Sequence, residues 1–251
     1  LVYFGFLQCI FLLVIYTFSS EIKKSLNPYL IAFIVVLFLG LLGRVLHSLH
    51  VFGASYKLLA ISEYATFLFG ATVYLLTKSS VTGVQFSIRD LIHYVPGLAY
   101  IIVISIYFVF APPSVISARV QSGELFRAVL LFMGTGLLVN FSYWILSFRL
   151  FLRFKHELSN EVSFAVKSRF FQSFLIAIGV CLVCWLVVYI VGAFEQTWIE
   201  RRIRPTIWLG LAYLILFISY YMTKDPQLFK LAPIVAPKKY AQSKLTSPEL
   251  D

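Results

Sequence analysis

The sequence predicts an all-α polytopic membrane protein, a bundle of seven transmembrane helices with its amino terminus outside the cell and its carboxyl terminus in the cytoplasm. Three observations support this. Hydrophobic residues make up 60% of the 251 residues and charged residues only 13%. The apolar residues gather in seven runs, and the basic residues divide unevenly between alternate loops. Soluble domains average about 45–50% apolar and about 25% charged residues, so the composition argues against a soluble enzyme or a disordered chain.

The first three apolar runs cover residues 1–19, 28–51 and 57–77. The first has neither a basic leader nor a small-residue cleavage site, so we expect a helix and not a signal peptide. The second begins at Pro28, which suits the first turn of a helix. A helix needs about 20 apolar residues to cross a bilayer, and these runs are near that length.

The remaining four runs follow the same pattern. The fourth opens near Asp90 and closes at residues 112–113, and the fifth runs from Glu124 to the region 149–155. The sixth covers residues 170–194 and the seventh residues 206–222. A helix satisfies its own backbone hydrogen bonds, which is why a chain in hydrocarbon adopts this structure.

The distribution of basic residues sets the expected orientation. With seven crossings, seven of the 21 Lys and Arg residues lie on the side of the amino terminus and fourteen on the other side. Cytoplasmic loops retain Lys and Arg, so the second side is expected to be the cytoplasm. The cluster Arg201, Arg202 and Arg204 opposes this assignment because it lies in an outer loop.

The end of the fifth run alternates bulky apolar and basic residues, and a polar stretch at residues 157–166 follows it. We expect Arg149, Arg153 and Lys155 to form a basic face toward anionic lipid headgroups of the inner leaflet. The alternative is that these residues only set the topology.

Ionisable residues inside the spans are the strongest indication of a functional site, because each costs about 2.5–3.5 kcal/mol at mid-bilayer. Arg44 and His47 lie near the outer end of the second helix, and Glu63 lies near the outer end of the third. We therefore expect Arg44 and Glu63 to form an ion pair with His47 nearby. The functional interpretation is an outward-facing pocket that recognises a ligand or senses pH. The alternative is an ion pair that only fixes two helices.

Three further residues complete the candidate set. Arg127 and Trp208 lie at outer helix ends, where they are expected to rim the same pocket; the alternative is the ordinary charged and aromatic interface belt. Asn140, in the inner half of the fifth helix, is expected to make an interhelical hydrogen bond.

The usual signatures of enzymes and metal sites are absent from the sequence. It contains no HExxH motif, no GxSxG motif with triad partners and no paired intramembrane aspartates. Cys9, Cys181 and Cys184 all lie in apolar runs and are interpreted as small buried hydrophobic residues. The expectation is a protein that is not an enzyme and that binds neither a metal nor a cofactor.

Four segments carry a resemblance to a known family. They are Phe-Leu-Phe-Gly-x-x-x-Tyr-Leu within residues 67–76, His-Tyr-Val-Pro at 93–96, Asp-Pro-x-Leu-Phe at 225–229, and Lys-Tyr-Ala-x-Ser-x-Leu-x-x-x-Glu at 239–249. With these, the chain resembles the membrane-embedded amino-terminal half of Bacteroidetes-type transcription regulators that end in an AraC-type helix-turn-helix domain. The resemblance implies a sensor domain at residues 1–223 and a cytoplasmic linker at residues 224–251. A DNA-binding domain would follow, and DNA would be contacted only through it.

The expected function is thus a sensor in the bacterial inner membrane that couples a small-molecule or peptide ligand at the outer face to a DNA-binding output. Its partners would be the lipid bilayer and either a second copy or another membrane protein. Two alternatives remain open. An accessory or assembly subunit of a larger membrane complex would have a large contact with a different protein and no enclosed pocket. An intramembrane enzyme or transporter would have a continuous polar cavity that reaches mid-bilayer, lined by both Glu63 and Asn140.

Overall fold

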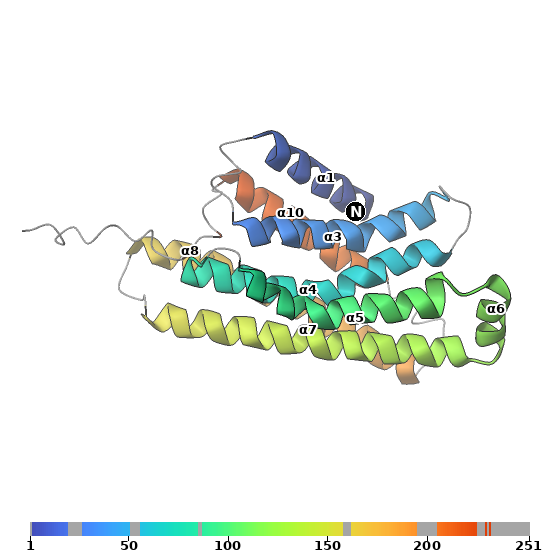
Figure 1. Cartoon of the computed structure of the whole chain (residues 1–251). Helices are drawn as coiled ribbons and strands as arrows, with labels where there is room; N and C mark the ends of the chain where they lie inside the picture. Colours follow the sequence, from blue (N-terminus) through green and yellow to red (C-terminus); the bar gives the residue numbers. More distant parts are fainter. Residues whose placement is uncertain are drawn as a thin grey trace, which may run out of the picture.

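The computed structural model is all-helical over the part of the chain that it describes, which comprises residues 2–19, 27–50, 56–84, 87–157, 162–194, 205–224, 229 and 231. The helices lie alongside one another as an elongated bundle (Figure 1). Five of them are long and apolar enough to cross a membrane. The apolar stretches Val2–Phe18 and Ile207–Met222 are shorter. The chain is therefore an all-helical protein with several helices suited to a bilayer.

The first helices begin and end close to the predicted positions. They are α1 (Val2–Phe18), α3 (Pro28–Ser48) and α4 (Leu59–Thr82), with a short 3₁₀ turn, η1 (Tyr56–Leu58), before α4. Asn27 caps α3, because its side-chain oxygen accepts a hydrogen bond from the Tyr29 amide at 3.0 Å. Gly83 ends α4 with φ +68°, a left-handed conformation that favours glycine.

The fourth apolar run is not one regular helix. It consists of a 3₁₀ segment, η2 (Ile88–Tyr94), the helix α5 (Val95–Ile104) and a π-helical turn, η3 (Ser105–Val109). Pro96 lacks an amide hydrogen, so it is tolerated only where a helix begins, and α5 begins one residue before it. A further short helix, α6 (Pro113–Gln121), lies across one end of the bundle (Figure 1); it was not predicted.

The last three helices are α7 (Glu124–Glu157), α8 (Val162–Phe194) and α10 (Pro205–Lys224). The sequence placed the start of the sixth helix at residue 170, but α8 begins at Val162, so most of the expected polar connection at 157–166 is helical. Residues 162–166 contain neither Gly nor Pro, so their composition is compatible with the first turns of α8. α7 has 34 residues and α8 has 33; at about 1.5 Å per residue both exceed the ~30 Å hydrocarbon core.

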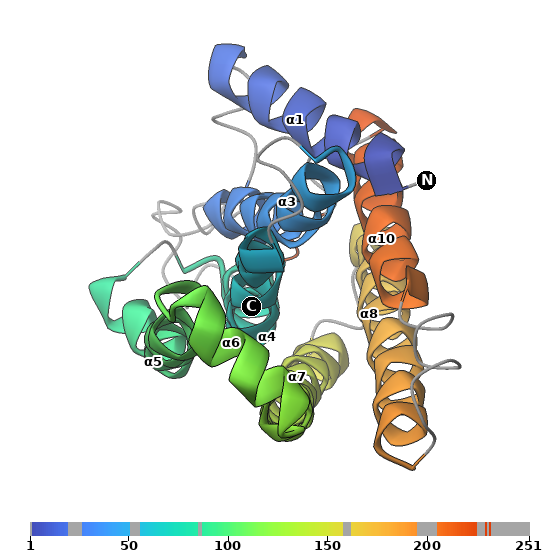
Figure 2. The ribbon, with the colours of Figure 1, turned by 90° about the vertical axis from the view of Figure 1, so that its right-hand side faces the viewer.

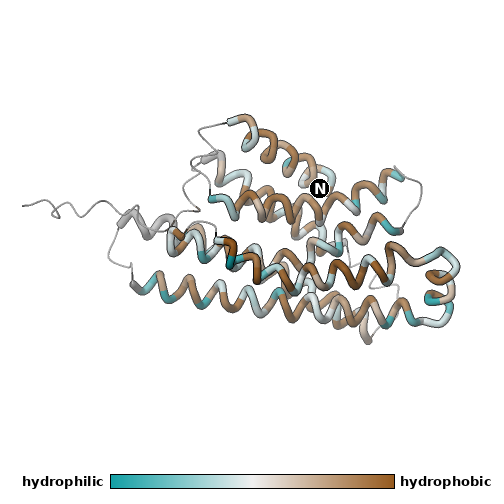
Figure 3. Tube along the Cα trace, viewed as in Figure 1, coloured by the Kyte–Doolittle hydropathy of each residue, from teal (hydrophilic) through white to brown (hydrophobic). Residues whose placement is uncertain are grey.

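α4 occupies the middle of the bundle, where it packs against α3, α5 and α7 (Figure 2). α8 and α10 form a second side, and α1 covers α3 and α10. Apolar residues extend along most of the length of the helices, while hydrophilic residues gather near helix ends and turns (Figure 3). Large apolar side chains such as Ile102, Leu138 and Val180 are exposed on the outer faces. This distribution is typical of helices surrounded by hydrocarbon.

The bundle end opposite α6 is closed by polar and aromatic contacts. Asp90, which is buried, accepts hydrogen bonds from the Tyr29 hydroxyl at 2.6 Å and from Lys78 Nζ at 2.8 Å. Its Oδ2 also accepts from the backbone amide of Ser87 at 3.2 Å. The cluster joins the start of α3, the end of α4 and the start of η2. The sequence analysis did not identify it.

Two residues after α10 dock onto the same end. The Phe229 side chain is fully buried, with its ring edge-on to Phe170 and Phe174 at centroid distances of 5.0 and 5.5 Å. The backbone amide of Leu231 donates a hydrogen bond to the carbonyl of Ser80 in α4 at 2.8 Å. Beyond these two residues, most of the predicted linker at 224–251 lies outside the described part of the chain, as does the basic cluster at 201–204.

The close approach of α3 and α4 yields a stability prediction. A methyl group added at Gly43 would overlap the carbonyl oxygen of Leu58 and would lie 2.7 Å from Ser62 Oγ, whereas one added at Gly40 would meet Leu211 and Ala65 at the ordinary distances of 3.4 and 3.5 Å. We expect Gly43→Ala to lower the free energy of unfolding by about 1–3 kcal/mol, as overpacking does. Gly40→Ala, the matched control, should change it little. SDS-induced unfolding of the purified protein measures both, and equal unfolding midpoints would contradict the packing described here.

Candidate ligand-binding cavity

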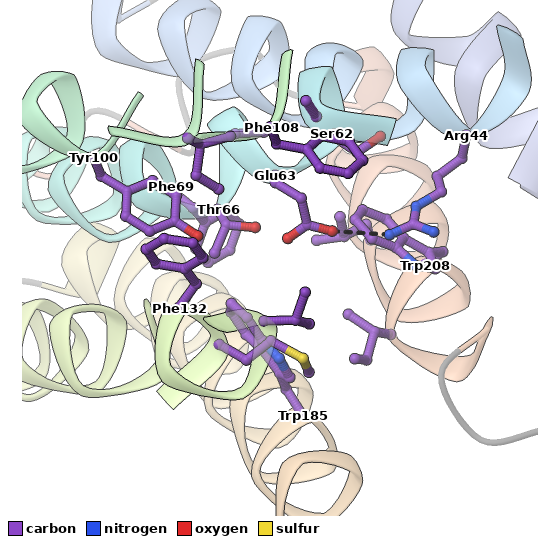
Figure 4. A pocket seen from close by; sticks show the side chains of 18 of the residues that line it. Arg44, Ser62, Glu63, Thr66, Phe69, Tyr100, Phe108, Phe132, Trp185 and Trp208 are labelled. Carbon is purple, nitrogen blue, oxygen red and sulfur yellow. Dashed lines mark hydrogen bonds and ion pairs between the residues drawn. The ribbon is translucent and has the colours of Figure 1, made fainter. Parts of the chain in front are cut away.

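A cavity of about 520 Å³ lies inside the bundle at the end covered by α6. Side chains from α3, α4, α5, α6, α7, α8 and α10 line it, and most of them are apolar or aromatic. Ligand pockets for small molecules span about 300–1,000 Å³ and have mainly hydrophobic linings with a few polar groups. The cavity has the size and lining of such a pocket (Figure 4).

The predicted ion pair is present and borders the cavity. Arg44 Nη2 lies 2.9 Å from Glu63 Oε1, and the guanidinium lies over the Trp208 ring at 4.3 Å from its centroid. Arg44 lies one turn before the end of α3 and Glu63 one turn after the start of α4, so the antiparallel helices bring the two residues to the same depth. The structure therefore brings together Arg44, Glu63 and Trp208 of the predicted set.

The Glu63 carboxylate offers its second oxygen to the cavity. Figure 4 shows this oxygen directed away from Arg44, toward the part of the cavity where Thr66 and Tyr100 lie. Two further polar atoms of lining residues, Ser62 Oγ and Trp208 Nε1, are buried and have no hydrogen-bond partner within the described part of the chain. Buried polar groups in proteins are usually hydrogen-bonded, so these two atoms make this end of the bundle less completely satisfied than is usual.

α6 closes the end of the cavity. Its residues Ile116 and Val120 belong to the lining. Arg119 of the same helix donates to the Tyr107 carbonyl oxygen at 2.5 Å and lies over the Tyr107 ring. Arg119 Nε also lies 3.4 Å from a carboxylate oxygen of Glu124 at the start of α7. These contacts attach α6 to the helices on both sides of it.

Two predicted pocket residues lie elsewhere. His47 is not among the described residues that line the cavity, and its ring packs beside that of His50 with centroids 6.4 Å apart. Arg127 is exposed on α7 and also lies outside the lining. The helical period explains the position of Arg127. Ala128, Val129 and Phe132 share the face of α7 that lines the cavity, and residue 127 lies on another face.

Asn140 makes the interhelical contact expected of it. Its Nδ2 donates to the Thr66 carbonyl oxygen of α4 at 2.9 Å and to the Gly136 carbonyl oxygen of its own helix at 2.7 Å. Asn140 is buried and is not among the described residues that line the cavity. It therefore joins α7 to α4 beside the cavity.

The three basic residues expected at the lipid headgroups lie on the long end of α7. Arg149 and Arg153 are exposed there. Lys155 instead donates a hydrogen bond to Gln172 Oε1 of α8 at 2.8 Å. The difference arises because α8 packs against α7 at this level and places Gln172 within hydrogen-bond distance of Lys155.

The described residues contain no group of three or more His, Cys, Asp or Glu side chains placed to hold a metal ion. The cavity instead presents aromatic rings, one carboxylate oxygen and a few hydrogen-bonding groups, which suits non-covalent binding of a small, largely apolar molecule. No protein-family model, curated protein or solved structure matches the chain.

The ion pair yields a second prediction. Both side chains are about a third exposed or less, and removal of one leaves the other charge unpaired among apolar residues. Arg44→Met and Glu63→Gln should each lower the free energy of unfolding. The double variant should lose less free energy than the sum of the two single losses, with a coupling energy of roughly 0.5–3 kcal/mol. Combination of Glu63→Gln with Arg149→Met, at the opposite end of the bundle, should be additive. Additivity of the Arg44 and Glu63 variants in SDS unfolding would mean that the pair contributes no coupling.

Proposed function

We propose that this chain is the membrane-embedded sensor domain of a transcription regulator, in which a ligand in the cavity changes the packing of the helices. The observation that carries the proposal is the cavity of about 520 Å³ that borders the Arg44–Glu63 pair. A ligand shifts an equilibrium only if it binds one state better than another. A molecule in this cavity touches seven helices at once, so its affinity depends on how they pack.

The proposed topology has seven crossings, with the amino terminus outside and the carboxyl terminus in the cytoplasm. Five helices meet the length and apolarity expected of a span, and α1 and α10 supply the remaining two. The excess of basic residues on the second side supports the orientation. The cavity then opens near the outer leaflet, and Phe229 docks on the cytoplasmic side of the bundle. The membrane we propose is a bacterial inner membrane.

The output of the proposed sensor is a DNA-binding domain after residue 251. Support comes from the resemblance of the segments at 93–96, 225–229 and 239–249 to AraC-type regulators with a membrane-embedded amino-terminal half. DNA would be contacted only through that domain. A second copy of the chain is the partner that such a regulator would use to bind two adjacent half-sites.

The cavity also bears on the two alternatives. An accessory subunit is expected to have a large contact with a different protein and no enclosed pocket; a partly open cavity between the helices supports the sensor over this alternative. An enzyme or transporter was expected to have a polar passage lined by both Glu63 and Asn140. Glu63 lines the cavity, Asn140 does not, and the lining is mainly apolar.

The orientation predicts opposite labelling of two engineered cysteines. In a background with the three native cysteines replaced, Ser122→Cys in the turn before α7 should react with a membrane-impermeant maleimide on intact cells. Ser243→Cys in the carboxyl-terminal tail should react only after the cells are permeabilised. Reversed labelling would overturn the orientation. Labelling of both cysteines on intact cells would mean that the chain crosses the membrane an even number of times between residues 122 and 243, which would overturn the proposed topology.

The sensor role predicts a change in transcription when the cavity is filled. Ala128 lines the cavity, and Ala128→Phe in the chromosomal gene should occupy part of it. Cells with this variant should alter the same transcripts as cells that lack the gene. The matched control is Leu131→Phe on the same helix, where the side chain is 65% exposed toward the surroundings. If both variants leave the transcripts as in the parent strain while a deletion changes them, the cavity is not the sensing site.

A further inference from the structure

The inference concerns the chemical class of the cavity ligand, and it rests on the proposed function. Of the two charges at the cavity, the carboxylate is the more accessible: the Glu63 side chain is 33% exposed and the Arg44 side chain 21%. The guanidinium is also covered on one face by the Trp208 ring, at 4.3 Å. A ligand therefore meets Glu63 before it meets Arg44.

Oxygen atoms gather on the wall beside Glu63. The second carboxylate oxygen points toward the region where Thr66 and Tyr100 lie, and the side-chain hydroxyl groups of both residues belong to the cavity wall (Figure 4). A carboxylate only accepts hydrogen bonds, and a hydroxyl group accepts as well as donates. This part of the cavity therefore suits a head group that donates several hydrogen bonds.

Aromatic rings surround the same region. The Phe132 ring lies edge-on to Tyr100 and Tyr107, with centroid distances of 5.3 and 6.1 Å, and all three residues line the cavity. Aromatic faces attract cations, and an aromatic cavity with a carboxylate is the usual arrangement for an ammonium group. Arg119, the basic residue of α6, is paired with Glu124 and is not among the described residues that line the cavity.

The remainder of the lining indicates that the part of the ligand behind its head group is apolar. Val36, Leu37, Ile104, Val129 and Leu182 contribute apolar side chains. An acidic head group would meet the Glu63 carboxylate and be repelled, while an uncharged one would donate a hydrogen bond to the carboxylate without the added attraction between opposite charges. We propose that the cavity binds an amphipathic organic cation, whose ammonium head shares the Glu63 carboxylate with Arg44 and whose hydrocarbon body fills the apolar part.

Three probes of one chain length test the proposal: dodecylamine, dodecanol and dodecanoate. Each is titrated into the full chain in phosphatidylcholine nanodiscs at pH 7, and binding is followed by the fluorescence of Trp185 and Trp208, which line the cavity. We expect dodecylamine to bind about tenfold more tightly than dodecanol, since only the ammonium group adds a charge–charge attraction to its hydrogen bond with the Glu63 carboxylate. Dodecanoate should bind most weakly.

Glu63→Gln should remove the preference for the amine, so that dodecylamine and dodecanol bind with similar affinity. Glu157→Gln, the control, makes the same change in charge at the far end of α7 and should preserve the preference. The proposal is overturned if dodecanoate binds most tightly, or if Glu63→Gln retains the preference for the amine. If one of these results is obtained and Ala128→Phe still abolishes binding of the probes, the cavity is a binding site, as the proposed function requires, but its ligand is not an organic cation. If Ala128→Phe leaves the binding of all three probes intact, both proposals fail.

Discussion

The ion pair between Arg44 and Glu63 is the central polar contact at the end of the bundle that α6 covers. It joins α3 and α4 next to the point where Gly43 lets the two helices approach most closely. The pair neutralises two charges that would each be costly in hydrocarbon. Because Arg44 also lies over Trp208, the same interaction attaches α10 to these helices. This contact therefore joins three of the helices that line the cavity.

The two ends of the bundle differ in how completely their polar groups are satisfied. At the α6 end, Ser62 Oγ and Trp208 Nε1 are buried without a hydrogen-bond partner among the described residues, and a cavity separates the helices. At the other end, Asp90 accepts hydrogen bonds from Tyr29 and Lys78, and phenylalanine rings fill the space. Helices packed around a cavity repack at lower cost than helices around a filled core, so the α6 end is the one suited to respond to a ligand.

The sequence was sufficient for some of these features and not for others. Arg44 and Glu63 were predictable as a pair because consecutive antiparallel helices place their adjoining ends at one depth. The distinction between Arg127, which is exposed, and Ala128, which lines the cavity, was not predicted, since it depends on which other helices surround the start of α7. The hydrogen bonds from Tyr29 and Lys78 to Asp90 depend on tertiary packing between separate segments, which no local pattern encodes. The hydrogen bond from the Ser87 amide to Asp90 is different, because it belongs to a local Ser-x-x-Asp capping box.

The hydrogen bond between Leu231 and Ser80 attaches the chain after α10 to the same helix, α4, that carries Glu63. Glu63 and Ser80 belong to one helix, and at about 1.5 Å per residue the 17 steps between them span roughly 25 Å. The Leu231–Ser80 hydrogen bond thus links the segment after α10 directly to the helix that carries Glu63, in addition to the packing of Phe229 on α8. A displacement of α4 along its axis would move the cavity wall and this attachment together.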